Sequence, residues 1–469
     1  MATLIMKFGG TSVGSVEAIA QVCAIVKSYK QDWDHLVVVV SAMRGVTDSL
    51  IKCADLAVLR DEEQYLSLIK QLGEIHVSTM EGVIPDEVER RSLSTQLEQH
   101  ITELRAYCHS IHVLGEVTAR GMDTITSLGE RMSAPLIAAA LRDVGLRAQA
   151  VNAAQLIITD ASYQHANPLE EATRDKVNEM LVPLLEGEII PVVTGFVAAT
   201  QEGIITTLGR GGSDYTAAIL GDSLDATEVW TWTDVDGVMT ADPRIVMDAR
   251  VIPELSFNEV SELAYFGAKV LHPKTLRPII ERDIPLWVKN TFKPESTGTK
   301  IIRSSAPVLG KVTAITTIRD LSLVTVEGRG MLGIPGIAAR TFAAVARQGA
   351  SVLMISQASS EQSICFVIPT ETVPGVLQSI ESEMELELSR RDIDRVWAQP
   401  DIVIVTAVGA GLRNTPGIAG RIFSALGQEG INVIAIAQGS SEYSISIVVA
   451  EVDANNAVQQ IHKEVILNG

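Results

Sequence analysis

Short apolar runs alternate with longer amphipathic stretches along the first 305 residues. β-Branched and aromatic residues cluster in TLIMKF, HLVVVV, IIPVV and EVWTW, and glycine or small polar residues follow each run. Apolar residues recur at helical spacing in intervening stretches such as SVEAIAQVCAIVKSYK. This alternation predicts an α/β fold in which a largely parallel sheet is sandwiched by helices. Residues 56–111 show no strand pattern and are rich in Leu, Glu and Gln, which predicts a helical excursion from the sheet.

The chain repeats itself beyond residue 305. IPGIAARTFAAVARQGASVLMISQASSEQSICFVI (334–368) aligns without gaps with TPGIAGRIFSALGQEGINVIAIAQGSSEYSISIVV (415–449), and about half of the positions are identical. Each copy has the pattern of a strand, a glycine loop, a helix, two strands and a further amphipathic stretch. Such a duplication predicts two copies of one small module that pack against each other. The predicted domains are therefore residues 1–305, 306–395 and 396–469, with a linker near residues 304–307.

Composition narrows the class of protein. A chain of 469 residues, with 46% hydrophobic and 20% charged residues, is globular and long enough for two or three domains. The net charge of −19 argues against a nucleic-acid or anionic-membrane partner. No apolar run reaches the roughly 18 residues of a membrane span, and the N-terminus shows no export signal. The four cysteines have neither metal-site spacing nor disulfide density, so we expect a reducing, cytoplasmic location.

A dinucleotide-type motif precedes the helix of the first copy, but its context argues against nicotinamide binding. Gly328, Gly330 and Gly333 form the spacing GxGxxG between a strand and a helix. The next strand, SVLMISQ, ends without the acidic residue that would bind a ribose, and the second copy reads GAGLRN. A glycine loop at a helix N-terminus would instead suit a small carboxylate.

Two glycine-rich motifs follow strands and predict anion binding. In KFGGTS (7–12), two glycines allow backbone N–H groups to approach a phosphate beside the Lys7 ammonium, although an ordinary turn is the alternative. In TTLGRGGSD (206–214), glycines surround Arg210 before a helix start, which predicts an anion nest with a charged clamp.

Further polar groups follow other predicted strands. WTDVDGV and TADPR place carboxylates and hydroxyls where open α/β sheets bind ligands. FGAKVLHP supplies Lys269, and His272, which precedes a proline in an apolar setting, is expected to be structural. Glu130 either pairs with Arg131 at the surface or binds a substrate ammonium.

In this order, KFGGTSVGS, VVSAM, SLGER, TTLGRGGSDYTA, WTDVDGV, TADPR and FGAKVLHP resemble the aspartate kinases of the amino-acid-kinase superfamily. The resemblance covers essentially the whole chain, since the repeat is similar to the paired ACT modules of that family. It implies an amino-acid-kinase fold followed by two ACT-like α+β modules. It also implies transfer of the γ-phosphoryl group of ATP, with Mg²⁺, to the side-chain carboxylate of L-aspartate, the first step of lysine, threonine and methionine biosynthesis.

The resemblance also implies roles for individual residues. A carboxylate nucleophile is already deprotonated, so the site needs positioning and charge neutralisation rather than a general base. The implied catalytic residues are Lys7, Asp214 and Lys269. The implied ATP-binding residues are Lys7, Gly9, Gly10, Ser12, Thr233, Asp234, Met239, Arg244, Lys269 and Val270, with Met239 standing where the family often has tyrosine. The implied aspartate-binding residues are Ser41, Thr47, Glu130, Arg210, Gly211, Gly212 and Ser213.

By the same resemblance, the repeat is regulatory. Gln357 and Gln438, with Ile337 and Ile418 at the helix starts, are the predicted effector-binding residues. A glutamine amide suits a hydroxyl-bearing zwitterion, whereas lysine would need a carboxylate that SVLMIS and NVIAIA lack, so threonine is favoured over lysine. Retention of a dimer-forming turn is the alternative. We expect a homodimer or homotetramer assembled through the ACT modules.

Several interpretations stay open. The acceptor could be another small acid, such as acetylglutamate or carbamate, and the chain could be a silent amino-acid sensor or a fragment of a fusion with homoserine dehydrogenase. The intact Lys7, Arg210, Asp214 and Lys269 argue against the sensor. Because one module can be inserted into the other in this family, KVTAITTI (311–318) could pair with the C-terminal half.

Overall fold

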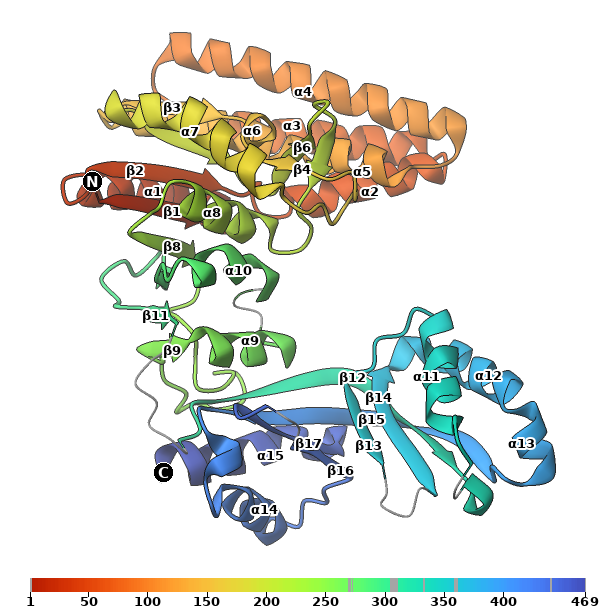
Figure 1. The fold of residues 1–469 in the computed structure, drawn as a ribbon. Coiled ribbons are helices and arrows are strands. Elements are labelled where there is room, and N and C mark those ends of the chain that lie inside the picture. The colour runs from red at the N-terminus through yellow and green to blue at the C-terminus, as the bar shows by residue number, and fades with distance from the viewer. Residues whose placement is uncertain are drawn as a thin grey trace. The chain divides into compact units, whose positions relative to one another are not determined.

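The computed structural model describes residues 2–268, 271, 273–303, 311–331, 334–357, 362–438 and 441–468 (Figure 1). The predicted linker at 304–307 lies outside these residues, as do Lys269, Val270, His272 and Gly333. The chain forms two compact units. The first unit consists of Met1–Val238, Val251–Phe257 and Val270–Ser305, and the second consists of Met239–Arg250, Asn258–Lys269 and Ala306–Gly469.

An eight-stranded sheet forms the centre of the first unit, in the order β3-β5-β2-β1-β8-β10-β11-β9. All neighbouring pairs are parallel except β10 and β11. Apolar residues occupy both faces of β1 and β2, as parallel strands covered on both sides require. The strands are β1 (Thr3–Phe8), β2 (His35–Val40), β3 (Ala148–Val151), β5 (Ile190–Thr194), β8 (Glu228–Thr233), β9 (Glu254–Ser256), β10 (Leu286–Asn290) and β11 (Thr299–Ile302).

Helices cover both faces of this sheet, which confirms the predicted fold class. Helices α1 and α6, with α2–α4 outside them, share one apolar core with the sheet, and α7 and α8 cover the opposite face with α10 beside α8. A small second sheet contains β4 (Ile158–Thr159), β6 (Val197–Thr200) and β7 (Ile205–Thr207). The helices are α1 (Val16–Tyr29), α2 (Val46–Val58), α3 (Glu62–Val83), α4 (Glu87–Leu114), α5 (Ala119–Thr126), α6 (Leu128–Asp143), α7 (Glu170–Glu186), α8 (Gly212–Ser223) and α10 (Pro273–Glu281).

The predicted helical excursion is formed by α3 and α4 (Figure 1). Their boundaries follow local chemistry. The Asp61 carboxylate accepts a hydrogen bond from the N–H of Gln64, and the Asp86 carboxylate accepts one from the N–H of Glu89, so each helix starts at an N-cap. Helix α4 ends at Gly115, which adopts a left-handed φ of 78°.

The second unit has a six-stranded antiparallel sheet in the order β13-β14-β12-β15-β17-β16. Each repeat contributes strand, helix, strand, strand and helix, as predicted. The strands are β12 (Ala314–Glu327), β13 (Met354–Gln357), β14 (Ser363–Pro369), β15 (Arg395–Val408), β16 (Ala435–Ala437) and β17 (Ser444–Ala450). The helices are α9 (Phe257–Tyr265, mostly in this unit), α11 (Ile337–Arg347), α12 (Val373–Glu383), α13 (Glu385–Arg390), α14 (Ile418–Gln428) and α15 (Glu451–His462).

Strand β12 is shared by the two modules. Its first half, which includes the last five residues of KVTAITTI, pairs with the end of β15, and Ile315 lies in one core with α14 and α15. Its second half pairs with β14 as well, and Val326 lies in the core of α11 and α12. The segment ahead of the first copy therefore completes the second module, which answers the question that the sequence left open.

The segment Met239–Arg250 also packs on the second module. The hydroxyl of Thr240 and Nε2 of His462 form a buried hydrogen bond of 2.9 Å. Ala241 and Val246 belong to the same apolar core as α14 and α15. This segment carries the TADPR motif, so part of the predicted ATP site belongs to the unit that contains the repeat.

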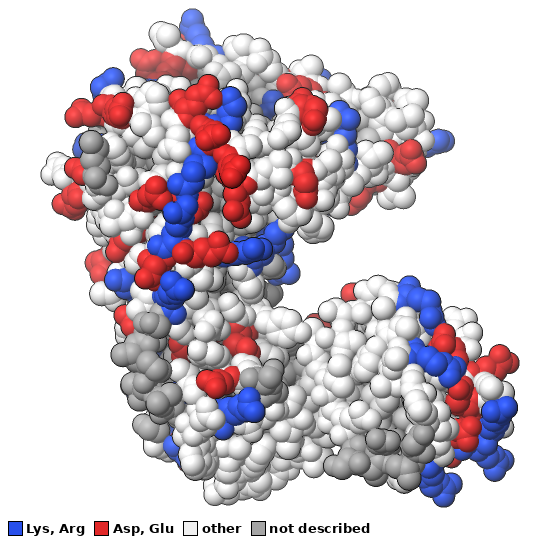
Figure 2. All heavy atoms as spheres, viewed as in Figure 1, with Lys and Arg blue, Asp and Glu red and all other residues white. Residues whose placement is uncertain are grey.

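Charged side chains on the surface are interspersed. Figure 2 shows acidic and basic residues side by side on the visible face. In the first unit, Asp222 forms ion pairs with Arg174 at 3.2 Å and with Arg282 at 2.8 Å. Exposed pairs contribute little to stability, so we attribute the stability of the unit to its apolar core. Within the described residues, no helix is long and apolar enough to cross a membrane.

The sharing of β12 makes a testable prediction. Ile315→Ala should loosen the second module, because removing a buried Ile side chain costs about 2–5 kcal/mol. We expect faster amide hydrogen exchange in α15 and unchanged exchange in α12. The matched variant Val326→Ala, in the core of the first module, should give the opposite pattern. Equal loosening of α12 and α15 by Ile315→Ala would contradict the assignment.

Candidate active site

An open cavity of about 710 Å³ lies in the first unit where β1 and β2 end and α8 begins. The carboxyl ends of parallel strands and a helix N-terminus meet there, as in other ligand-binding α/β sheets. The cavity brings together most of the residues predicted for catalysis and aspartate binding. Its wall includes Lys7, Gly10, Ser41, Thr47, Glu130, Arg210, Gly211, Gly212, Ser213 and Asp214.

A buried ion pair joins β1 to α8. Nζ of Lys7 lies 2.8 Å from Oδ1 of Asp214, and both side chains are largely buried. The hydroxyl of Thr231 on β8 donates to the same carboxylate oxygen at 3.3 Å. Asp214 lies in the first turn of α8, where the helix dipole stabilises a carboxylate. The pair therefore holds a lysine ammonium at the cavity wall.

Glu130 presents a carboxylate without a full set of partners. It lies in the first turn of α6 and is only 3% exposed. One interaction comes from the N–H of Ala42, whereas its Oε2 has no hydrogen-bond partner among the described residues. Burial raises the pKa of Glu130 to about 8. A buried acceptor without a partner is costly, and an ammonium group bound beside it would satisfy it and favour the ionised carboxylate.

The predicted alternative for Glu130, a surface pair with Arg131, is wrong. Arg131 instead lies 3.3 Å from the Glu103 carboxylate on α4. Gly129 allows α6 to approach the end of β2, because a Cβ at this position would lie 2.7 Å from Cβ of Ala42. Adjacent residues of α6 thus face different environments, and only Glu130 lines the large cavity.

The Arg210 loop connects β7 to α8. Gly209 and Gly211, on either side of Arg210, have left-handed φ values of 76° and 73°. Arg210 is exposed in the cavity and forms no ion pair within the described part of the chain. Its guanidinium is therefore available for an anionic ligand, and guanidinium groups bind carboxylates in a bidentate manner.

The remaining predicted residues have different environments. Ser12 is fully buried, and its hydroxyl lies 2.7 Å from that of Thr291. Thr233 donates to Asp234 at 3.2 Å near the end of β8. Gly9, Ser12, Thr233 and Asp234 do not line the large cavity, Met239 and Arg244 belong to the second unit, and Lys269 and Val270 lie outside the described residues.

Several residues of the cavity wall were not predicted from the sequence. Phe196 follows β5 and has a positive φ of 65°, which is strained for an aromatic residue. Its N–H donates to the hydroxyl of Thr216 at 3.0 Å, which fixes the turn. The motif TGF after a strand was the available signal. The other missed residues include Arg44, Asp48, Asp123, Gln164 and His165, whereas Thr207 belongs to the predicted motif TTLGRGGSD.

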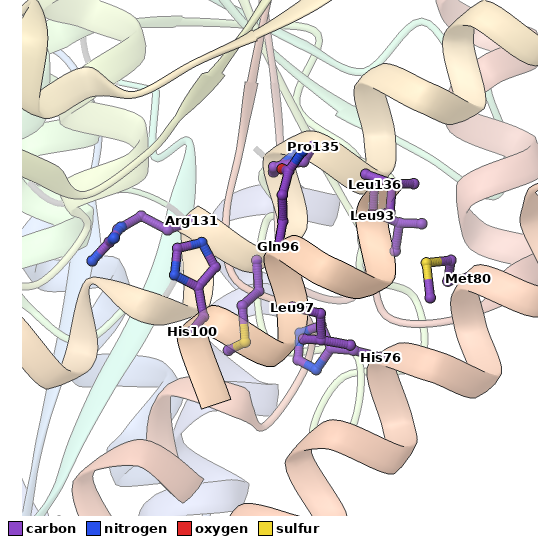
Figure 3. Close-up of a pocket in the computed structure, with 10 residues that line it drawn as sticks. His76, Met80, Leu93, Gln96, Leu97, His100, Arg131, Pro135 and Leu136 are labelled. Carbon is purple, nitrogen blue, oxygen red and sulfur yellow. The ribbon is translucent and has the colours of Figure 1, made fainter. Parts of the chain in front are cut away.

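A second, much smaller cavity lies between α3, α4 and α6 (Figure 3). Its volume of about 20 Å³ admits roughly one water molecule. His76 and His100 contribute to its lining, and burial lowers the pKa of both imidazoles. Nδ1 of His76 lies 2.7 Å from the carbonyl oxygen of Leu72, so Nε2 is the free acceptor. A cavity of this size excludes a nucleotide or an amino acid.

Comparisons with known proteins identify the class to which this fold and site belong. Residues 2–290 match the model of the amino acid kinase family, and residues 324–384 and 405–465 each match the ACT domain. The chain belongs to the amino acid kinase family and, within it, to the aspartokinases.

The similarity to individual aspartokinases extends along the whole chain. Chloroplastic aspartokinase 1 of Arabidopsis thaliana is 33% identical, with 100% of this chain and 81% of the relative covered. The crystal structure of E. coli aspartokinase III in complex with aspartate and ADP has 30% identity and a TM-score of 0.80, covering 98% of this chain and 99% of that one. The predicted resemblance is confirmed.

Bifunctional proteins are also similar. Chloroplastic bifunctional aspartokinase/homoserine dehydrogenase 1 of Arabidopsis thaliana is 38% identical, with 98% of this chain and 51% of the relative covered. The chain thus spans about half the length of the bifunctional relatives that it matches.

The burial of Glu130 predicts that the stability of the folded chain decreases as the pH rises. The folded pKa of about 8 exceeds the ordinary value of 4.5, so the folded chain retains a proton that the unfolded chain has lost. The contribution of Glu130 to the free energy of unfolding is therefore largest below pH 4.5. It decreases as the pH rises to 8, by at most about 1.4 kcal/mol per pH unit. Glu130→Gln should therefore gain stability relative to the wild type between pH 5.5 and 8.5.

Thermal denaturation of both proteins across this range measures the difference. The control is Glu63→Gln, which alters an exposed glutamate on α3 and should leave the difference flat. Parallel curves for the wild type and Glu130→Gln would contradict the assignment.

Proposed function

We propose that this chain is an aspartate kinase, which transfers the γ-phosphoryl group of ATP to the side-chain carboxylate of L-aspartate to give L-4-aspartyl phosphate. The observation that carries the proposal is that one cavity contains an acidic side chain with one unpartnered oxygen and a basic side chain without an ion pair among the described residues. The unpartnered Glu130 oxygen is complementary to an ammonium, and the Arg210 guanidinium is complementary to a carboxylate. E. coli aspartokinase III, which is similar over its full length, was solved with aspartate and ADP.

The chemistry needs charge neutralisation more than proton transfer. The acceptor carboxylate is already ionised, so its approach to a triphosphate brings negative charges together. Lys7 supplies a positive charge at the cavity wall, and Asp214 fixes the position of its ammonium. Ser41, Thr47 and Ser213 would add hydroxyl donors to the acceptor, and backbone N–H groups at Gly211 and Gly212 would add to the positive potential.

The nucleotide side of the proposal rests on family resemblance. Lys7, Gly9 and Gly10 would contact the triphosphate, and Lys269 would approach the transferring group as a second cation. The other residues proposed for ATP are Ser12, Thr233, Asp234, Met239, Arg244 and Val270.

Mg²⁺ is expected to arrive with ATP. The described residues contain no cluster of three or more His, Cys, Asp or Glu that could hold a metal ion alone. Mg²⁺ is commonly held by substrate phosphates together with one or two carboxylates, and Asp214 is the carboxylate nearest to Lys7. When bound, the ion would neutralise part of the phosphate charge.

The regulatory part of the proposal concerns the repeat. Gln357 and Gln438 are exposed at the ends of the edge strands β13 and β16, in equivalent places of the two modules. Ile337 and Ile418 begin α11 and α14 and are buried. We propose that these residues bind threonine, in an assembly of two or four chains. Lysine is the competing ligand, because E. coli aspartokinase III was also solved with lysine and aspartate.

Trapping of the acyl phosphate with hydroxylamine tests the activity. Arg210→Ala should raise the KM for aspartate about tenfold to a hundredfold, because a charged hydrogen bond contributes about 1.5–3 kcal/mol, while the KM for ATP changes little. Lys7→Ala should mainly lower kcat, because its charge acts on the moving phosphoryl group. A wild-type chain that binds ATP but yields no product with aspartate would redirect the assignment to another acid, with acetylglutamate and carbamate tested next.

Inhibition assays test the regulatory assignment. Threonine should inhibit the wild type, and Gln357→Ala and Gln438→Ala should each weaken that inhibition without changing uninhibited kcat. Gln362→Ala, at an exposed glutamine of the same turn region, is the matched control and should leave inhibition intact. Inhibition by lysine alone would overturn the choice of ligand, and indifference to both amino acids would reduce the repeat to an assembly element.

A further inference from the structure

Asp123 is a buried carboxylate beside the candidate site that no step of the proposed reaction uses. It lies on α5 and is 1% exposed, yet it borders the large cavity. Its carboxylate accepts hydrogen bonds from the N–H of Gln164 at 2.9 Å and from the N–H of Thr207 at 3.1 Å. The hydroxyl of Thr207 donates to it at 2.7 Å. Both carboxylate oxygens are therefore engaged.

These hydrogen bonds fix two segments that meet at the Arg210 loop. Thr207 is the last residue of β7 and lies three positions before Arg210. Gln164 belongs to the loop between β4 and α7, and the N–H of the nearby Ala166 donates to the carbonyl oxygen of Thr207 at 3.0 Å. Asp123 thus joins α5, the 160–167 loop and the start of the Arg210 loop at one point.

The backbone around this point needs a rigid anchor. Gln164 has a left-handed φ of 68°, and Gly209 has one of 76°. A Cβ at Gly209 would lie 2.7 Å from Nδ1 of His165 and 2.8 Å from the carbonyl oxygen of Gln164, so the two loops are in close contact. A left-handed φ is strained for Gln164, though not for a glycine, and such strain persists only where the surroundings hold the residue in place.

Asp123 differs from Glu130 in what it can offer to a ligand. Glu130 retains an oxygen without a partner, whereas Asp123 directs its oxygens at protein donors. Burial raises the pKa of Asp123, while its hydrogen bonds to Gln164 and Thr207 and the nearby His165 lower it. An asparagine at this position would present one acceptor oxygen and an NH₂ group, which would face backbone donors.

We propose that Asp123 is a positioning residue for the amino-acid acceptor. Its hydrogen bonds to Gln164 and Thr207 fix the Arg210 loop, and Asp123 itself does not touch the substrate. This inference rests on the proposed function, because it takes Arg210 as the acceptor-binding group. It predicts that the damage from losing Asp123 falls on acceptor binding rather than on the nucleotide.

The test compares the wild type with Asp123→Asn, Thr207→Val and Thr207→Ser in the full chain. Asp123→Asn should raise the KM for aspartate about tenfold, with the KM for ATP and kcat within about twofold of the wild type. Thr207→Val removes only the hydroxyl donor and should have a smaller effect of the same kind. Thr207→Ser keeps the hydroxyl and should show wild-type kinetics. If the effect of Thr207→Val came from altered packing, Thr207→Ser would be impaired as well.

A double variant separates positioning from independent binding. Because both residues act through one guanidinium, Asp123→Asn should add little to the KM of Arg210→Ala. Fully multiplicative effects would overturn the proposal, as would an unchanged KM for aspartate in Asp123→Asn. If Asp123→Asn does not fold, Thr207→Val and Thr207→Ser carry the comparison.

Amide hydrogen exchange gives a readout independent of activity. Residues 208–213 should exchange faster in Asp123→Asn, or in Thr207→Val, than in the wild type, and unchanged exchange would overturn the proposal. An inactive wild type would count against the aspartate kinase assignment, whereas an active wild type with indifferent Asp123 and Thr207 variants would count against the positioning role alone.

Discussion

The parallel register of β1 with β8 is the constraint on which the candidate site depends. In this register Lys7 lies beside Thr231, so both side chains share one face of the sheet. Asp214 of α8 meets both groups, at 2.8 Å from the lysine ammonium and 3.3 Å from the hydroxyl. A slip of one residue would turn Lys7 toward the apolar face that carries Phe8 and Trp232, where its charge would be unpaired. The same apolar packing that fixes the sheet therefore also fixes the ammonium at the cavity.

Two buried carboxylates near that cavity show how a fold separates support from binding. Asp123 is bonded to the N–H of Gln164 and to the N–H and hydroxyl of Thr207, so its desolvation is compensated within the protein. Glu130 is similarly buried but keeps one oxygen unpartnered, so the N–H of Ala42 compensates its desolvation only in part, its pKa is raised, and a further donor would complete the compensation. A site poised for a ligand is less stable without it, which is the usual trade between stability and activity.

The features of the fold and site that could be predicted from sequence are those encoded by residues close together in the chain. Alternation of apolar runs and helical stretches predicted the sheet and its helices, and glycines next to Lys7 and Arg210 marked two loops that do meet. Asp123 was not predicted as a site residue because its partners Gln164 and Thr207 lie 41 and 84 positions away, and no short motif encodes such a contact. The surroundings of Glu130 were ambiguous for the same reason.

The second unit shows why motif order alone could not divide the chain. TADPR follows β8 in sequence, but Ala241 and Val246 of this region are part of the core that contains α14 and α15, and Thr240 is bonded to His462. Met239 and Arg244, which we propose as ATP-binding residues, therefore lie in a segment whose buried side chains pack in the core of the second module. Packed cores switch between discrete arrangements rather than deform smoothly. A ligand that favours one arrangement of this module would therefore act on the Met239–Arg250 segment through its buried Thr240, Ala241 and Val246.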